Sequence, residues 1–178
     1  MYLLTAAVVI VGLLCLLDLI LTLGVIRRLR EHTETLAQLS SSGRDGIAPG
    51  TVVGDIHGRS ITGTAIDRTF LTGGEDTVIG FFSPGCGPCK ALLPEYLSFV
   101  SDIPSRVLTV IVGDHDAASE YVEALAGTGE IVVESPPGAI AQALGVDGYP
   151  TICMVDNGGR VVAAGASTRT LRAYAAAT

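Results

Sequence analysis

The chain contains no tryptophan, and its 178 residues include only four cysteines and three histidines. The histidines are scattered, and two of the cysteines stand alone: Cys15 in an apolar segment and Cys153 in an expected strand. A closed zinc site needs four cysteine or histidine ligands at paired spacings, so the scarcity of these residues argues against a zinc-binding domain. For an isolated apolar cysteine, a buried and unreactive thiol is the ordinary expectation, with a regulatory role for Cys153 as the alternative.

Basic residues are also few. The chain has 11 lysines and arginines against 18 aspartates and glutamates, which gives a formal net charge of −7. From Gly46 to Thr178 there are 7 basic and 14 acidic residues, so this part carries the whole excess of negative charge. Nucleic acids and anionic membrane surfaces attract basic proteins. The acidity therefore argues against both as partners, and its ordinary effect is to keep the domain soluble.

The other two cysteines form a pair, in the stretch Cys86-Gly87-Pro88-Cys89. An apolar run from Thr77 to Phe82 precedes the pair and predicts a buried strand, and a helical pattern from Lys90 to Val100 follows it. At a helix N-terminus, free N–H groups and the helix dipole favour a thiolate. A second cysteine one turn later can close a disulfide with the first. The same spacing also occurs as half of a zinc site, but the absence of a second pair favours redox chemistry.

The remaining pattern alternates between strands and helices. We expect strands at Arg106–Gly113, Ile131–Glu134, Thr151–Val155 and Val161–Ala164, and helices at Ala117–Ala126, from Pro136 and Pro137 to Leu144, and at Thr168–Ala175. Asp114 or Asp116 is placed to cap the first of these helices. The stretch Asp156–Arg160 contains Asn-Gly-Gly and predicts a tight hairpin. The alternation indicates an α/β fold, with a central sheet and helices on both faces.

The order of these motifs resembles the thioredoxin superfamily over roughly residues 50 to 170. The resemblance rests on an opening hairpin within Gly50–Asp67, the redox pair, the later stretch Gly148-Tyr149-Pro150-Thr151, and a closing hairpin and helix. Within the superfamily the chain is most similar to the membrane-anchored TlpA group, particularly its MauD-like members. In those proteins Ser-Pro precedes the first cysteine, as Ser83-Pro84 does here, and Lys-x-Leu-Leu-Pro follows the second, as in Lys90–Pro94.

The resemblance implies a thioredoxin-like fold with a central mixed sheet, in which a cis-proline, Pro150, faces the redox pair. Cys86 and Cys89 would be the catalytic residues, with Gly87-Pro88 as the redox loop between them. Pro88 would hold its φ near the start of the helix, and Gly87 would let a partner backbone approach. Tyr149 and Pro150 would shape a substrate groove in which an extended client segment pairs with the backbone.

Two positions depart from the family pattern. Ordinary thioredoxins carry a tryptophan just before the first cysteine and a buried acidic residue in the preceding strand, and this chain has Gly85 and Gly80 there. Glu75, Asp76 and Glu95 are the acidic residues nearby in sequence, and the sequence assigns none of them to the role of buried proton acceptor.

The N-terminal segment has a different composition. Met1 to Ile26 contains a single charged residue, Asp18, and is long enough to span a bilayer as one helix. No basic segment precedes it and no small-residue cleavage site ends it, so we expect a retained anchor rather than a signal peptide. The predicted organisation is a transmembrane anchor at residues 1–26, a juxtamembrane helix and flexible linker at 27–49, and a thioredoxin-like domain at 50–178.

Two features give opposite indications about the side of the membrane. Arg27, Arg28 and Arg30 follow the span, and by the positive-inside rule they place the domain in the cytoplasm. The resemblance implies the opposite, because TlpA-type domains work outside the cytoplasmic membrane. We expect a single-pass protein of the cell membrane with an extracytoplasmic catalytic domain.

These features predict a membrane-anchored thiol-disulfide oxidoreductase that works without a cofactor or a metal. The Gly-Pro pair between the cysteines resembles the reducing members of the family, which indicates reduction of client proteins, for example during maturation of exported metalloproteins. The partners would be a client with a disulfide or dithiol and an upstream membrane thiol donor of electrons.

Two alternatives belong to other classes. A thiol peroxidase would carry a proline seven residues before its reactive cysteine, where this chain has Ile79, and a Ser or Thr three before, where it has Ser83. A non-enzymatic metallochaperone would use C-x-x-x-C with a histidine, which is one residue longer than the spacing found here.

Overall fold

The computed structural model describes residues 2, 5, 12 and 47–176. Among these residues, no helix is long and apolar enough to cross a membrane. Apart from the three isolated positions, the predicted anchor and the predicted juxtamembrane segment up to residue 46 lie outside the described part of the chain. The chain divides into two compact units, Met1–Gly43 and Arg44–Thr178, and the fold that follows is that of the second.

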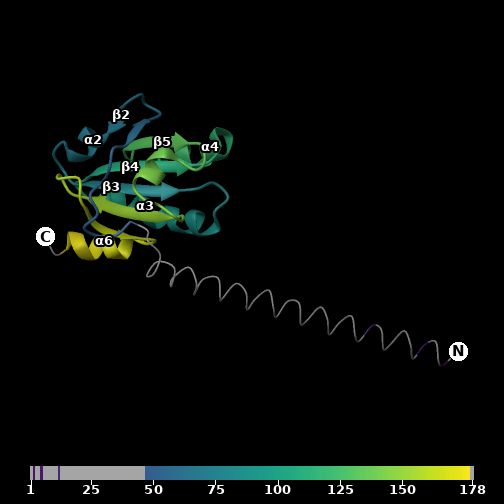
Figure 1. The fold of residues 1–178 in the computed structure, drawn as a ribbon. Helices are drawn as coiled ribbons and strands as arrows, with labels where there is room; N and C mark the ends of the chain where they lie inside the picture. The colour runs from purple at the N-terminus through teal and green to yellow at the C-terminus, as the bar shows by residue number, and fades with distance from the viewer. Residues whose placement is uncertain (1, 3–4, 6–11, 13–46, 177–178) are drawn as a thin grey trace. The chain divides into compact units, whose positions relative to one another are not determined.

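A five-stranded mixed sheet forms the centre of this unit (Figure 1). The strands lie in the order β5-β4-β3-β6-β7, in which β3, β4 and β5 run parallel. β6 is antiparallel to β3, and β7 is antiparallel to β6. The strands are β3 (Thr77–Phe82), β4 (Arg106–Val112), β5 (Glu130–Glu134), β6 (Thr151–Val155) and β7 (Val161–Gly165). This arrangement confirms the predicted α/β fold with a mixed sheet.

The sheet separates two apolar clusters. Successive side chains of a strand point to opposite faces, so Val78 and Phe82 of β3 join one cluster while Ile79 and Phe81 join the other. Residues of α3, α4 and α6 pack in the first cluster, and residues of α2 and α5 pack in the second. The helices are α2 (Arg68–Thr72), α3 (Gly87–Asp102), α4 (His115–Ala124), α5 (Ala139–Ala143) and α6 (Thr168–Ala175). Helices therefore cover both faces, as the alternation of the sequence indicates.

Three helices differ from the sequence-based expectation. The helix expected from Pro136 and Pro137 begins only at Ala139, because the two prolines lie in a turn and Gly138 takes a φ of +80° at the cap position. α4 begins two residues earlier than expected, with Asp114 at its N-cap, although the Asp114 side chain makes no capping hydrogen bond. The short helix α2 was not expected, since five residues are too few to display a helical period.

The opening hairpin lies in the later part of its predicted range. β1 (His57–Arg59) pairs antiparallel with β2 (Ala65–Asp67). The preceding residues instead run beside β7, where Val52 forms an isolated bridge with Arg160 and the Val53 amide donates to the carbonyl of Gly159 at 2.8 Å. The first residues of the domain thus lie beside β7, the edge strand of the sheet.

The turn between β6 and β7 forms as predicted. A carboxylate oxygen of Asp156 accepts hydrogen bonds from the amides of Gly158 at 2.9 Å and Arg160 at 2.8 Å. Gly159 takes a φ of +77°, a left-handed value that favours glycine. The local sequence is therefore sufficient to explain this turn.

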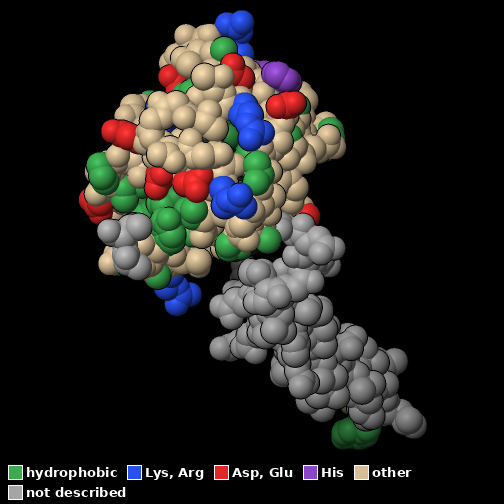
Figure 2. Space-filling view, turned by 60° about the vertical axis from the view of Figure 1, so that its left-hand side comes forward, with side chains coloured by type: hydrophobic (Ala, Val, Ile, Leu, Met, Phe, Trp, Pro, Cys, Tyr) green, Lys and Arg blue, Asp and Glu red, His purple; other side chains and the backbone are tan. Residues whose placement is uncertain are grey.

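The described surface carries both charged and hydrophobic side chains. On the face shown in Figure 2, acidic and basic side chains are interspersed and lie beside a patch of hydrophobic ones. Within residues 47–176 the large hydrophobic side chains most open to solvent are Val52 and Ile61, each about half exposed. Ile61 lies in the β1–β2 turn, so these side chains belong to the edges of the fold rather than to the redox site.

A network of hydroxyl groups fastens the β1–β2 hairpin to the edge strand β5. The hydroxyls of Thr62 and Thr64 donate to the two carboxylate oxygens of Glu130 at 2.7 and 3.0 Å, and the hydroxyls of Ser60 and Thr62 lie 2.7 Å apart. Hydrogen bonds from Ser60, Thr62 and Thr64 favour the ionised carboxylate and lower the pKa of Glu130. The ionised form of Glu130 therefore holds the hairpin in place.

This network predicts a pH-dependent contribution to stability. A carboxylate whose pKa is lowered in the folded state stabilises the protein at pH values above its ordinary pKa of 4.5. This contribution is lost as the pH falls through the lowered pKa. We expect Glu130→Gln to lower the free energy of unfolding at pH 7 by less than about 1 kcal/mol, because the carboxylate is close to solvent. The difference from the wild type should shrink below pH 4.5 in urea titrations. Glu123→Gln, an exposed position on α4, is the matched control, and a difference that stays constant with pH would contradict the network.

Candidate redox site

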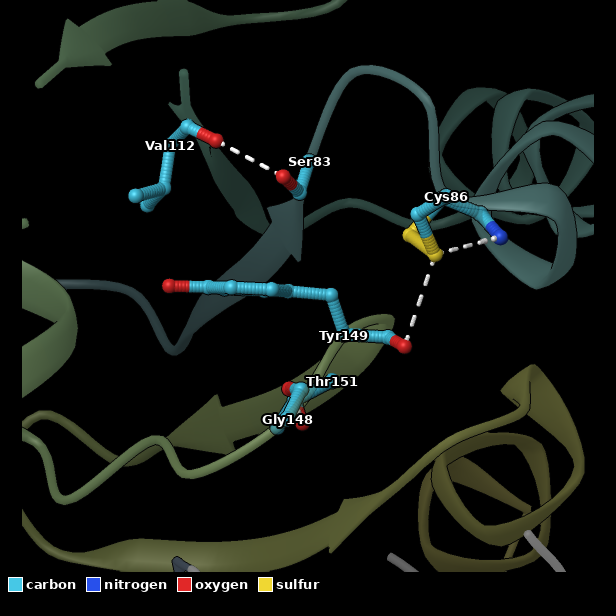
Figure 3. The surroundings of a disulfide bond; sticks show 7 residues. Ser83, Cys86, Val112, Gly148, Tyr149 and Thr151 are labelled. Atoms are coloured by element: carbon cyan, nitrogen blue, oxygen red, sulfur yellow. Dashed lines mark hydrogen bonds between the residues drawn. A yellow bond between two sulfur atoms is a disulfide. The ribbon is translucent and has the colours of Figure 1, made fainter. Parts of the chain in front are cut away.

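Cys86 and Cys89 lie where β3 meets α3 and form a disulfide in the structure, with their Cα atoms 5.2 Å apart (Figure 3). Cys86 is the N-cap of α3, and its sulfur accepts a hydrogen bond from the Cys89 amide at 3.2 Å. Cys86 is half-buried, whereas Cys89 is fully buried in the apolar cluster under α3. The sulfur of Cys86 is thus placed to meet a partner, and the amide at the helix start is placed to stabilise its thiolate.

Two of the three residues before Cys86 contact the end of β4 and the residue that follows it. The Ser83 hydroxyl donates to the main-chain oxygen of Val112 at 2.9 Å. The ring of Pro84 covers Gly113, where a β-carbon would come within 2.6 Å of the proline Cδ. Gly85 takes a φ of +79°, a left-handed value that a tryptophan rarely adopts. The backbone of this loop therefore favours glycine at position 85, where ordinary thioredoxins carry a tryptophan.

The segment before β6 faces the disulfide. The peptide bond between Tyr149 and Pro150 is cis, and Pro150 is buried. The main-chain oxygen of Tyr149 lies 3.5 Å from the sulfur of Cys86, a distance at which a reduced Cys86 thiol donates a hydrogen bond to it. The Thr151 hydroxyl donates to the Gly148 oxygen at 2.8 Å and so ties this turn to the start of β6.

The side chain of Tyr149 points away from the disulfide, so that its backbone is what meets Cys86 (Figure 3). The ring is half-buried and packs against both apolar clusters. Partial burial of the phenol raises the pKa of Tyr149, and the nearby Glu134 adds to this effect. The phenol of Tyr149 therefore stays uncharged at neutral pH and lies away from the disulfide.

Lys90 is the charged side chain nearest to the redox pair along α3. Its ammonium group lies 3.0 Å from a carboxylate oxygen of Glu120 on α4, and both side chains are exposed. The hydrogen bond and the charge of Glu120 raise the pKa of Lys90. Ion pairs exposed to solvent contribute little to stability, so this pair chiefly offsets the positive charge beside Cys89.

The strand position at which ordinary thioredoxins carry a buried acid is filled by an aromatic ring. A β-carbon on Gly80 would lie 2.7 Å from the hydroxyl oxygen of Tyr96 and 2.9 Å from an edge carbon of Phe82. Glu95 is not a buried replacement, because its side chain is exposed, and its carboxylate accepts a hydrogen bond from Thr168 of α6. Sequence reasoning did not identify Tyr96. The signal that was available is Gly80 itself, because a glycine inside a strand often marks the close approach of another group.

Cys153 lies outside the redox site. It is fully buried in β6 on the face of the sheet opposite Cys89. Burial raises the pKa of the Cys153 thiol to about 12, so at neutral pH it stays protonated. No group of three or more histidine, cysteine, aspartate or glutamate side chains within the described part of the chain could hold a metal ion.

The chain is also similar in sequence to known proteins. The thioredoxin family model matches residues 60–129. The chain is 34% identical over 85 residues to protein disulfide isomerase-like 1-1 of Arabidopsis thaliana, an alignment that covers 48% of this chain and 14% of the relative. It is 31% identical over 81 residues to protein disulfide-isomerase of Gallus gallus, covering 46% of this chain and 12% of the relative. The chain thus spans only a small part of the curated relatives that it matches.

Solved structures show the same fold. The thioredoxin domain of a thiol-disulfide oxidoreductase from Bacteroides vulgatus superimposes with a TM-score of 0.61 at 19% identity, covering 74% of this chain and 98% of that one. StoA from Bacillus subtilis superimposes with a TM-score of 0.56 at 21% identity, covering 70% and 98% of the two chains. The solved structures show that the chain has the thioredoxin fold, and the part matched by the thioredoxin family model contains the Cys86–Cys89 pair.

The exposure of the cysteines predicts an order of reaction. After reduction of the full chain in a Cys15→Ala background, we expect iodoacetamide to alkylate Cys86 about tenfold or more faster than Cys89 and Cys153, because only Cys86 combines access with a helix N-terminus. Peptide mass spectrometry after timed quenching measures the three rates. Cys86→Ser should remove the fast reaction, and fast alkylation of Cys153 would contradict the buried position described here.

Proposed function

We propose that this protein is a membrane-anchored thiol-disulfide oxidoreductase that reduces disulfides in client proteins. The observation that carries the proposal is the half-buried sulfur of Cys86, which caps α3, is joined to the buried Cys89 and faces the Tyr149–Pro150 turn. One accessible and one buried cysteine at a helix start suit a two-step exchange of disulfides.

The exchange proceeds through a mixed disulfide. The Cys86 thiolate attacks one sulfur of the client disulfide, forms a new bond with it and releases the other client sulfur as a thiolate that takes up a proton. Cys89 then loses its proton and attacks the sulfur of Cys86, which releases the second client thiol and leaves the Cys86–Cys89 disulfide. Two electrons pass to the client, and an upstream membrane dithiol returns two electrons to this protein in a second exchange of the same kind.

The surroundings of the pair suit this chemistry. Gly87 and Pro88 are exposed in the first turn of α3, where the glycine offers no side chain to block a client backbone. In this proposal the main chain of Tyr149 and Pro150, which faces Cys86, forms the opposite side of the client-binding groove. An extended client segment would pair with the main chain beside Pro150 and present its disulfide to Cys86.

The direction of transfer is tested by the reduction potential of the pair. For the full chain in detergent micelles, equilibrated with glutathione or dithiothreitol buffers and read by alkylation, we expect a value near that of thioredoxin, about −270 mV. Cys86→Ser is the control and should show no redox transition. A value near about −120 mV would make the protein an oxidant, and failure of any Cys86–Cys89 disulfide to form would reject the redox function itself.

The membrane anchor at residues 1–26, the extracytoplasmic position and the MauD-like subgroup are part of the same proposal. They are supported by the apolar composition of the segment and by the Ser83-Pro84 and Lys90–Pro94 motifs. The fold also resembles that of a putative thiol:disulfide interchange protein DsbE from Chlorobium tepidum, at 20% identity and a TM-score of 0.57 over 74% of this chain and 94% of that one. The client class that this subgroup suggests is an exported metalloprotein with a cysteine pair.

A trapping variant tests the client and the side of the membrane together. Cys89→Ser should accumulate mixed disulfides in cells, because no second thiol remains to release the client from Cys86. We expect mass spectrometry of the trapped partners to identify exported proteins, metalloproteins among them. The Cys86→Ser/Cys89→Ser double variant is the matched control. Partners confined to the cytoplasm would overturn the extracytoplasmic position, in agreement with Arg27, Arg28 and Arg30.

A further inference from the structure

The strand that leads to the redox pair contains a notch. Gly80 lies in the middle of β3, and β3 is buried along its whole length. A β-carbon at Gly80 would come within 2.7 Å of both the Cζ and the hydroxyl oxygen of Tyr96 and within 2.9 Å of Phe82. Real β-carbons do not come so close to other heavy atoms, so α3 reaches this depth on the sheet only because position 80 has no side chain.

Tyr96 ties α3 to two strands at this notch. Its ring meets that of Phe82 edge to face, with centroids 5.0 Å apart, and its hydroxyl lies 3.0 Å from the hydroxyl of Thr109 on β4. Thr109 is the register partner of Gly80, so the two positions share one face of the sheet. Tyr96 and Thr109 are both fully buried. Burial of two hydroxyl groups is favourable only while each satisfies the other.

The position of α3 decides where the sulfur of Cys86 lies. Cys86 caps α3 and moves with it, whereas the main-chain oxygen of Tyr149, 3.5 Å from that sulfur, belongs to the segment before β6. Cys89 and Tyr96 both face the apolar cluster under α3, seven residues and about two helical turns apart. Pro94 lies between them and removes one internal hydrogen bond of the helix. Tyr96 therefore holds α3 on the sheet two residues after the position where the helix lacks that hydrogen bond.

We propose that Tyr96 is a positioning residue for the redox pair: through Thr109 and the Gly80 notch it sets the depth of α3 on the sheet and holds Cys86 against the carbonyl of Tyr149. The inference rests on the proposed thiol-disulfide exchange. Tyr96 and Thr109 then influence the redox equilibrium of the cysteine pair in addition to packing in the core.

The two redox states depend on this contact to different degrees. In the reduced form a protonated Cys86 has a hydrogen to donate to the Tyr149 oxygen, whereas the disulfide, like the thiolate that attacks the client, has none. Loosening α3 therefore removes a hydrogen bond that only the protonated, reduced form makes. In the reaction of the reduced protein with glutathione disulfide to give the protein disulfide and two glutathione thiols, the equilibrium should move toward the protein disulfide.

The experiment measures this equilibrium constant for the full chain in detergent micelles. Tyr96→Phe and Thr109→Val each remove the hydroxyl pair, and we expect each to shift the constant toward the disulfide by about two- to fivefold, the effect of one hydrogen bond. Thr109→Ser keeps a hydroxyl at the same position and should restore a value close to that of the wild type. Tyr121→Phe changes another tyrosine that faces Phe82, from α4 rather than α3, and should leave the constant unchanged.

The outcomes separate the inference from the function on which it rests. If the wild type forms no Cys86–Cys89 disulfide in these buffers, the proposed function fails. If the wild type equilibrates normally but Tyr96→Phe and Thr109→Val match it, Tyr96 is a packing residue only and the inference is wrong. Equal shifts in Thr109→Ser or Tyr121→Phe would also overturn it, because the effect would then be a general loosening of the core. If Tyr96→Phe fails to fold, the comparison of Thr109→Val with Thr109→Ser still tests the inference.

Discussion

The seating of α3 on the central sheet governs the geometry of the redox site. α3 begins where the central strand β3 ends, and its N-cap is a sulfur rather than the usual side-chain oxygen. The loop between them is short and is fastened to β4 through Ser83 and Pro84. The helix can then lie deep on the sheet because Gly80 leaves room for the ring of Tyr96. The packing of α3 on the apolar core therefore positions Cys86, and the loop between β3 and α3 takes its conformation from that packing.

Burial gives the cysteines of the domain different chemistry. Cys86 is open to a partner, and the N–H of Cys89 meets its sulfur, whereas Cys89 is enclosed by the cluster under α3. Cys153 is equally buried but on the other face of the sheet, and the raised pKa of its thiol keeps it protonated. A sheet between two apolar clusters thus isolates one reactive pair from a third thiol in the same small domain.

Local patterns account for much of the fold. The bounds of β3, β6 and α6 agree with the sequence-based expectation, because a continuous apolar run, a turn with Asn-Gly-Gly and a helical period are each contained in a few neighbouring residues. The helix expected from Pro136 starts later, and α2 was missed, because short helices take their limits from tertiary packing and turns rather than from propensity. The predicted anchor at residues 1–26 stays a prediction.

The amino-acid pattern was enough to identify the Cys86–Cys89 pair, its place at a strand-to-helix junction and the α/β class, since these depend on the spacing of neighbouring residues. Which groups surround the pair was decided by the folded chain. The Tyr149 oxygen comes from 63 residues further along and reaches Cys86 because β6 lies beside β3. Tyr96 fills the place of the missing acid because β3 and β4 align Gly80 with Thr109. Contacts of this kind depend on strand register and helix depth, which no local stretch of sequence specifies.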